Sequence, residues 1–207
     1  MKVRAKICGI TRIEDGLACA HHGADAIGLV FYPPSPRHVA TPQAREIARA
    51  LPPFVTTVAL FVDPPPDEVE AVLRAVRPDV LQFHGDETPE FCRRFGVPYL
   101  KAVRVQAGLN LVEYATCYRD AQGLLLDAYV EGQAGGTGLS FDWALIPTGL
   151  PLPLILSGGL EPGNVEAAIR QVKPWAVDVS SGVEAAKGLK DAAKIAAFMQ
   201  GVRNATL

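Results

Sequence analysis

The chain repeats one unit eight times, an apolar strand-like segment followed by a helical segment, and this alternation restricts its possible folds more than any other feature. Apolar runs bounded by turn residues predict strands over residues 3–8, 24–30, 54–62, 79–83, 97–103, 122–127, 153–157 and 175–180. Helical patterns follow them over residues 13–21, 41–50, 67–76, 89–95, 109–116, 141–146, 162–172 and 190–199. The strands are mostly apolar without a clean period of two, which is typical of strands buried on both faces of a parallel sheet.

Two α/β architectures fit this alternation, a closed (β/α)8 TIM barrel and an open doubly wound sheet. No Gly-x-Gly-x-x-Gly motif follows the first strand, where an open dinucleotide-binding sheet would carry it. Eight regular units therefore favour the barrel, which at 207 residues is small beside the roughly 250 residues typical of this fold. We expect residues 1–207 to form a single (β/α)8 barrel domain.

Charge and hydropathy narrow the class of partner. The formal net charge is −2, and the 20 lysines and arginines are spread along the chain without blocks, which argues against binding to nucleic acid or to an anionic membrane. No apolar run reaches the roughly 18 residues that span a bilayer, and the charged start leads into a strand, so a cytoplasmic protein is expected. The four cysteines form no Cys-x-x-Cys pair, and no histidine lies at metal-ligand spacing, so neither a metal site nor a disulfide framework is predicted. The expected partner is a small molecule.

The residues that follow the predicted strands form one candidate site, because the active sites of barrels lie at the carboxyl ends of the strands. They include Cys8, Arg37 in a proline-rich loop, His84, Asp127 and Asp178. Each has a structural alternative: a cysteine is often a small buried hydrophobe, an arginine a solvated residue, a histidine a loop brace, and an aspartate a cap or a hydrogen-bond acceptor inside the barrel. Position alone leaves these alternatives open.

The segments after the seventh and eighth strands predict a phosphate site. Gly158 and Gly159 follow one strand, and Ser181 and Gly182 follow the next. Glycine lets backbone N–H groups approach an anion closely, and many barrels bind phosphate at these two positions. The alternative is that these glycines only form tight turns.

A long glycine-rich loop follows the sixth strand over residues 127–138. Long loops in compact domains are usually functional, so we expect a lid, and Gly135 and Gly136 are second candidates for phosphate contacts. A connector without function is the alternative. Asp127 stands at the base of this loop, directly after three leucines, so a carboxyl group emerges there from an apolar strand.

Lys6 lies two residues before Cys8, which places both side chains on the same face of a strand. A nearby cation favours the thiolate and so lowers the pKa of the thiol. A turn that begins at Cys8 would spoil this alignment.

Together these motifs resemble the phosphoribosylanthranilate isomerase family of tryptophan biosynthesis over essentially the whole chain. The order and spacing of six segments carry the resemblance: Lys6-Ile7-Cys8-Gly9-Ile10-Thr11, Gly23-Ala24-Asp25-Ala26-Ile27-Gly28 leading to Ser35-Pro36-Arg37, Leu81-Gln82-Phe83-His84-Gly85, Leu126-Asp127 with Gly135-Gly136-Thr137-Gly138, Leu156-Ser157-Gly158-Gly159-Leu160 and Asp178-Val179-Ser180-Ser181-Gly182-Val183-Glu184. The departures, Phe83 where leucine is more usual and an aromatic pair before the arginine loop, remove no catalytic group.

The resemblance implies an isomerase without a cofactor. Such an enzyme converts N-(5-phosphoribosyl)anthranilate, a phosphosugar, into 1-(2-carboxyphenylamino)-1-deoxyribulose 5-phosphate by an Amadori rearrangement. The resemblance also implies Cys8 as the general base, Asp127 as the general acid and Arg37 as the group that faces the anthranilate carboxylate. His84 and Asp178 are expected to position the substrate.

Two other functions compete with this interpretation. A phosphoribosyl-imidazole isomerase of the histidine pathway performs the same rearrangement on a similar barrel, but it should carry aspartates in both catalytic roles and two phosphate sites, so Cys8 argues against it. A noncatalytic phosphosugar-binding barrel is the second alternative, and the presence of both Cys8 and Asp127 argues against that. The sequence leaves open whether the protein is a monomer or a homodimer.

Overall fold

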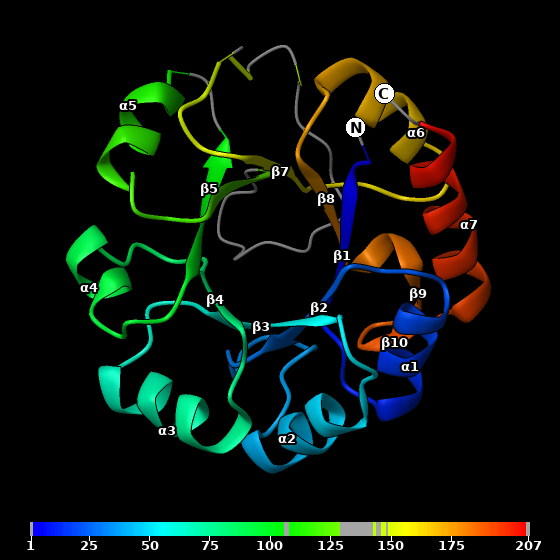
Figure 1. The fold of residues 1–207 in the computed structure, drawn as a ribbon, viewed down its shortest axis with the longest axis horizontal. Coiled ribbons are helices and arrows are strands. Elements are labelled where there is room, and N and C mark those ends of the chain that lie inside the picture. The colour runs from blue at the N-terminus through cyan, green and yellow to red at the C-terminus, as the bar shows by residue number, and fades with distance from the viewer. Residues whose placement is uncertain (1, 106–107, 129–142, 144–145, 148, 206–207) are drawn as a thin grey trace.

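Eight parallel strands close into a barrel in the computed structural model, which describes residues 2–105, 108–128, 143, 146–147 and 149–205 (Figure 1). The strands follow one another around the barrel in chain order, and β1 pairs with β8 to close it. Their bounds are β1 Arg4–Cys8, β2 Ala26–Val30, β3 Thr56–Phe61, β4 Val80–Phe83, β5 Tyr99–Val105, β6 Gly123–Ala128, β7 Leu154–Leu156 and β8 Ala176–Val179. The predicted fold class is confirmed, and every strand overlaps its predicted range.

Helices surround the barrel (Figure 1). Their bounds are α1 Ile13–His21, α2 Thr41–Ala50, α3 Pro66–Val76, α4 Pro89–Arg93, α5 Leu111–Cys117, α6 Val165–Val172 and α7 Ala192–Asn204. Proline stands in the first turn of α2, α3 and α4, where its missing N–H has no intrahelical partner in any case. The helix predicted over residues 141–146 lies largely outside the described residues.

The segment after β8 differs from the prediction. A short antiparallel hairpin forms there, β9 Glu184–Ala186 with β10 Leu189–Lys190. Helix α7 begins at Ala192, not at residue 190, because the carboxylate of Asp191 accepts hydrogen bonds from the backbone N–H groups of Ala193 (2.8 Å) and Lys194 (3.1 Å). The predicted start of this helix was therefore two residues too early, because residues 189 and 190 belong to strand β10.

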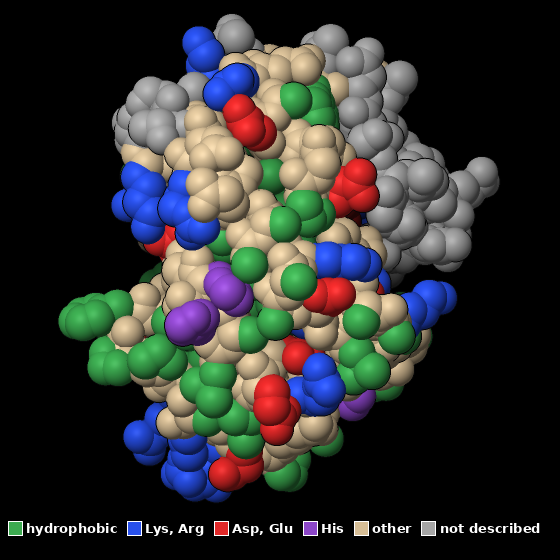
Figure 2. Space-filling model, turned by 90° about the vertical axis from the view of Figure 1, so that its right-hand side faces the viewer, with side chains coloured by type: hydrophobic (Ala, Val, Ile, Leu, Met, Phe, Trp, Pro, Cys, Tyr) green, Lys and Arg blue, Asp and Glu red, His purple; other side chains and the backbone are tan. Residues whose placement is uncertain are grey.

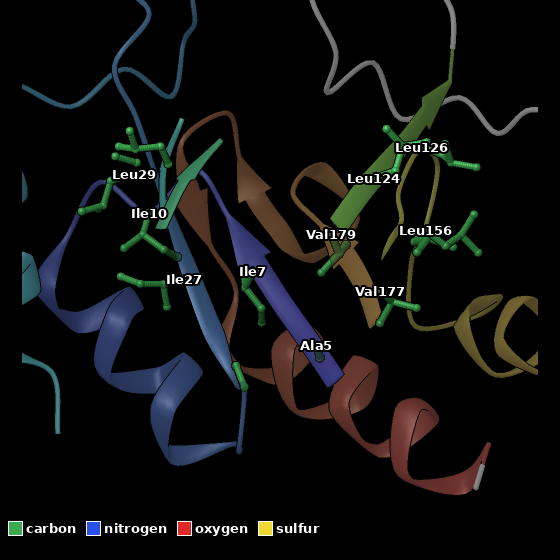
Figure 3. Packing of buried hydrophobic residues seen from close by; sticks show 14 of the residues in the cluster. Ala5, Ile7, Ile10, Ile27, Leu29, Leu124, Leu126, Leu156, Val177 and Val179 are labelled. Carbon is green, nitrogen blue, oxygen red and sulfur yellow. The ribbon is translucent and has the colours of Figure 1, made fainter. Parts of the chain in front are cut away.

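Side chains alternate across the barrel wall, and this alternation positions the site. Leu124 and Leu126 of β6 pack in the large cluster between the sheet and the helices, whereas Leu125 belongs to a small separate cluster. Figure 3 shows part of the outer layer, with Ile7 of β1 and Ile27 of β2. Because successive side chains of a strand point to opposite faces, the intervening residues point into the barrel. The inner face carries residues 6, 8, 82, 84, 127 and 178.

The surface shown in Figure 2 carries basic and acidic side chains interspersed among uncharged ones. Within the described part of the chain, no helix combines the length and the apolar character needed to cross a membrane. That residues 1–207 form one domain stays a prediction.

Candidate active site

A cavity opens at the carboxyl ends of the strands, where the sequence predicts the site. It contains about 690 Å³ of space not filled by atoms, part of which is open solvent. Its lining includes eight of the predicted site residues, namely Cys8, Arg37, His84, Asp127, Gly158, Gly159, Asp178 and Ser181. Residues from opposite ends of the sequence therefore meet around one space.

Cys8 and Asp178 line one wall of the cavity, and Lys6 contacts both of them; we call these three residues the thiol side. The ammonium Nζ of Lys6 lies 2.9 Å from Oδ1 of Asp178, and both side chains are 6% exposed. These two residues are register partners where β1 meets β8. The Lys6 ammonium also interacts with the buried thiol of Cys8, so the two side chains share a face as predicted.

Two opposing effects act on the Cys8 thiol. Burial raises its pKa, because a thiolate would lose its hydration, whereas the Lys6 ammonium lowers it, and the net direction is upward. The predicted lowering by Lys6 is thus real in direction but smaller than the effect of burial. Burial also lowers the pKa of Lys6, but the charges of Asp178 and of the Cys8 thiolate outweigh this and raise it, so Lys6 is a cation at neutral pH.

Two glycines make room for the thiol side and for Arg37. A Cβ atom on Gly28 would lie 2.7 Å from Sγ of Cys8 and 3.1 Å from Nζ of Lys6. A Cβ atom on Gly9 would lie 2.6 Å from Cδ of Arg37, and Gly9 has a φ of +78° that favours glycine. At both positions the backbone lies so close to a functional side chain that only glycine fits without a shift of its neighbours.

The facing wall, which we call the carboxyl side, consists of Gln82, His84 and Asp127. Nε2 of His84 lies 3.2 Å from Oδ2 of Asp127, and Nδ1 of the same ring lies 3.2 Å from the side-chain nitrogen of Gln82. All three side chains are buried, with Gln82 fully so. Asp127 therefore lies at one end of a buried hydrogen-bonded chain that begins on β4.

Arg37 is held by a carboxylate of the protein itself. Its Nε and Nη2 donate to Oε1 (2.7 Å) and Oε2 (2.9 Å) of Glu184, and Nζ of Lys190 donates to the same Oε1 at 2.9 Å. Burial raises the pKa of Glu184, but the hydrogen bonds from Arg37 and the charge of Lys190 outweigh it, so the net direction is downward. The bidentate pairing fixes the plane of the guanidinium at the rim of the cavity.

The predicted phosphate loops meet at the same end of the barrel. Gly158 and Gly159 have φ values of +86° and +64°, in the left-handed region that favours glycine, and they line the cavity with Ser181. Gly182 is not among the described lining residues; a Cβ there would clash with the backbone carbonyl of Leu160, so this glycine lets the two loops pack together. Gly135 and Gly136 lie outside the described residues.

A buried ion pair braces the loop after His84. Lys101 of β5 is fully buried, and its Nζ lies 3.0 Å from Oε2 of Glu87 and 2.6 Å from the carbonyl oxygen of Gly85. The Glu87 carboxylate in turn accepts hydrogen bonds from the backbone N–H groups of Gly85 and Asp63. These contacts fix the backbone that carries His84.

Sequence reasoning missed four residues of this region: Gln82, Lys101, Glu184 and Lys190. For Gln82 and Lys101 a signal existed, because each is a polar residue inside an otherwise apolar predicted strand. The described residues contain no group of three or more His, Cys, Asp or Glu side chains placed to hold a metal ion.

Comparison with known proteins identifies the family. The family model of N-(5'phosphoribosyl)anthranilate (PRA) isomerase matches residues 5–201. The N-(5'-phosphoribosyl)anthranilate isomerase of Nitrosospira multiformis is 60% identical over 202 residues, covering 98% of this chain and 97% of the relative.

Solved structures agree. Phosphoribosyl anthranilate isomerase from Thermotoga maritima superposes with a TM-score of 0.90 at 43% identity, over 98% of this chain and 99% of that one. A phosphoribosyl anthranilate isomerase in complex with reduced 1-(o-carboxyphenylamino)-1-deoxyribulose 5-phosphate gives a TM-score of 0.87 at 43% identity, with the same coverage of both chains. The barrel, the cavity at its carboxyl-terminal end and these similarities together place the chain in the N-(5'-phosphoribosyl)anthranilate isomerase family.

Proposed function

We propose that the cavity binds N-(5-phosphoribosyl)anthranilate, and that Cys8 is the general base and Asp127 the general acid of its Amadori rearrangement. The chain is an isomerase of the tryptophan-pathway family, and one solved relative binds a reduced analogue of the product. The observation that carries the assignment of roles is that a thiol from β1 and a carboxyl group from β6 line the same cavity.

The reaction needs one proton donor and one proton acceptor. The acid protonates the ring oxygen of the ribose, the bond between that oxygen and C1 breaks, and the ring opens to an imine. The base then takes the proton from C2, which gives an enolamine, and the enolamine tautomerises to the ketone product. A thiolate and a protonated carboxyl group on two walls of one cavity suit these two transfers.

The thiol side supplies the means to ionise Cys8. Lys6 stays protonated because Asp178 holds it, and its charge stabilises a thiolate that burial alone would disfavour. The proton that leaves C2 thus moves to Sγ of a residue beside a fixed cation. In this role Asp178 acts on the base through Lys6 as well as facing the cavity.

Two anion-binding features suit the ends of the substrate. The backbone N–H groups around Gly158, Gly159 and Ser181 would bind the phosphate, as glycine turns and loop ends commonly do. The anthranilate carboxylate would meet the Nη1 edge of Arg37, because Nε and Nη2 already bond to Glu184. Binding at both ends positions C1 and C2 between acid and base.

The test is turnover of freshly generated N-(5-phosphoribosyl)anthranilate, followed by the loss of its fluorescence, in the parent protein and in Cys8→Ala and Asp127→Ala. Each replacement should reduce kcat by about 10²- to 10⁴-fold while the protein stays folded. The matched controls are Cys19→Ala, a buried thiol outside the cavity, and Asp67→Ala in the first turn of α3, and both should keep the parent rate. A folded but inactive parent would contradict the substrate, and an active Cys8→Ala or Asp127→Ala would contradict that residue's role.

A further inference from the structure

Gln82 is the one fully buried residue of the carboxyl side that the proposed chemistry does not use. It stands on β4 between Leu81 and Phe83, lines the cavity, and places its side-chain nitrogen 3.2 Å from Nδ1 of His84. The other ring nitrogen of His84 lies 3.2 Å from Oδ2 of Asp127. The imidazole ring of His84 therefore links Gln82 to Asp127.

The chemistry of these three groups defines the direction of the hydrogen bonds. An amide nitrogen only donates, so Nδ1 of His84 must accept the bond from Gln82. A neutral imidazole carries one proton, which then resides on Nε2 and is donated to the carboxyl oxygen Oδ2 of Asp127. The chain runs in one direction, from Gln82 through His84 to Asp127.

The opposite orientation of the Gln82 amide is less favourable. With the carbonyl oxygen toward His84, the ring would carry its proton on Nδ1, and the lone pair of Nε2 would accept the acidic proton of Asp127, which would then not be available to the substrate. The present orientation pairs one N–H with Nδ1 and leaves the amide oxygen as the atom without a partner in the described part of the chain, and unpaired acceptors are better tolerated than unpaired donors. Both effects favour the orientation with nitrogen toward His84.

The unpaired oxygen argues against a purely structural role for Gln82. Its Oε1 is buried and has no hydrogen-bond partner among the described residues. Such an atom costs roughly 1–3 kcal/mol, which an apolar residue at position 82 would avoid. An amide at this position is explained by what its nitrogen does for His84.

We propose that Gln82 is a positioning residue: it fixes neutral His84 with its proton on Nε2, and through that proton it orients the carboxyl group of Asp127. This rests on the proposed role of Asp127 as the general acid. In this arrangement Oδ2 accepts the bond from His84, which fixes the orientation of the carboxyl group that delivers the proton. Without Gln82, the ring could turn either nitrogen toward Asp127, and the acid would be correctly arranged for only part of the time.

The experiment is nitrogen NMR of His84 together with steady-state kinetics in Gln82→Met and Gln82→Glu. Spectra are recorded at about pH 9, where imidazole is normally neutral, and the ring nitrogen without a proton resonates far downfield of the protonated one. The wild type should carry its proton on Nε2. Gln82→Met, which keeps the length without the amide, should show a mixture of tautomers, a kcat about tenfold lower, an almost unchanged KM and no loss of thermal stability.

Gln82→Glu inverts the test, because a carboxylate accepts a proton from Nδ1 and so draws the ring proton away from Asp127. We expect its spectrum to show Nδ1 protonated and its kcat to fall at least as far as that of Gln82→Met. The matched control is Gln122→Met, an exposed glutamine, which should change neither the spectrum nor kcat.

An unchanged Nε2 tautomer in Gln82→Met would overturn the proposal, whatever happens to its rate. So would a Gln82→Met protein that loses stability in step with its activity, because Gln82 would then be structural. Full activity in Asp127→Ala would overturn the acid assignment instead, and the tautomer measurement, which needs no turnover, separates that failure from this one.

Discussion

The thiol side and the carboxyl side of the cavity are built from different kinds of interaction. On the thiol side, a buried ion pair of 2.9 Å joins β1 to β8 and places a fixed cation beside Cys8. On the carboxyl side, Asp127 meets an imidazole ring that is itself held by an uncharged amide. In the proposed mechanism, the fixed cation lies beside the group that must become an anion, and the hydrogen bonds act on the carboxyl group that must be oriented. The following predictions test this difference.

The largest effect is expected on the thiol side from Lys6→Met. The change leaves the Asp178 carboxylate buried without its cation, which typically costs about 3–5 kcal/mol in the free energy of unfolding. Urea denaturation measures it, and Lys2→Met is the control. Lys2 pairs with Asp25 at a similar 3.0 Å, but the side chains are 74% and 29% exposed, so the loss should stay below about 1 kcal/mol. Equal losses in the two variants would show that burial of the pair does not matter.

Glu184→Gln is expected to have the next largest effect, because it removes the charge that holds Arg37 and Lys190. Loss of these charge-assisted hydrogen bonds should cost roughly 1.5–3 kcal/mol of stability at neutral pH and raise KM through a misplaced Arg37. The folded pKa of Glu184 is lowered, so its contribution is complete above the ordinary value of about 4.3 and disappears as the pH falls through the folded pKa. The stability difference from wild type should therefore shrink in acid. A difference that grows in acid would contradict this assignment.

Gly28→Ala tests how tightly the thiol side is packed. The new methyl group would lie 2.7 Å from Sγ of Cys8, and relieving such a contact costs typically about 1–3 kcal/mol. Since the atom that must move is the thiol itself, kcat should fall as well. Gly163→Ala is the control, because its nearest contact would be an ordinary 3.5 Å to Glu161. Full activity in Gly28→Ala would mean that the position of the thiol is not critical.

The smallest effect is expected on the pH at which the Cys8 thiol titrates. Because burial outweighs the effect of Lys6, the Cys8 thiol should titrate with a midpoint above the ordinary thiol value of about 8.5, measured as the difference in thiolate absorbance between the wild type and Cys8→Ala. Removing the cation in Lys6→Met should move this midpoint to higher pH, since Lys6 lowers the pKa of the thiol. A midpoint that does not move in Lys6→Met would contradict the effect of Lys6 on the thiol.

Much of the fold could be predicted from the sequence, because each strand is a short apolar run and each helix a separate amphipathic segment. The hairpin of β9 and β10 could not be predicted. Its strands have only three and two residues, which are mostly small or polar and carry no periodic signal. The start of α7 depended on one capping aspartate, which the helical pattern alone did not reveal.

For the candidate site, the sequence predicted positions but not partners. Cys8, His84 and Asp127 were expected because they follow strands, and they line the cavity as expected. The partner of Arg37 lies 147 residues away and that of Lys6 lies 172 residues away, and no local pattern encodes such pairs. Likewise, the effect of burial on the Cys8 thiol is visible only in three dimensions.

The closure of the barrel between β1 and β8 has a consequence for the time at which the protein becomes active. Every residue of the carboxyl side has been synthesised once Asp127 has been added, but the thiol side needs Asp178, which is added later. Pairing of the first strand with the last is also the contact with the longest loop to close, and such contacts form slowly. We therefore expect chains that lack β8 to have no ion pair beside Cys8, so that the proposed base is complete only when the first and last strands of the barrel have paired.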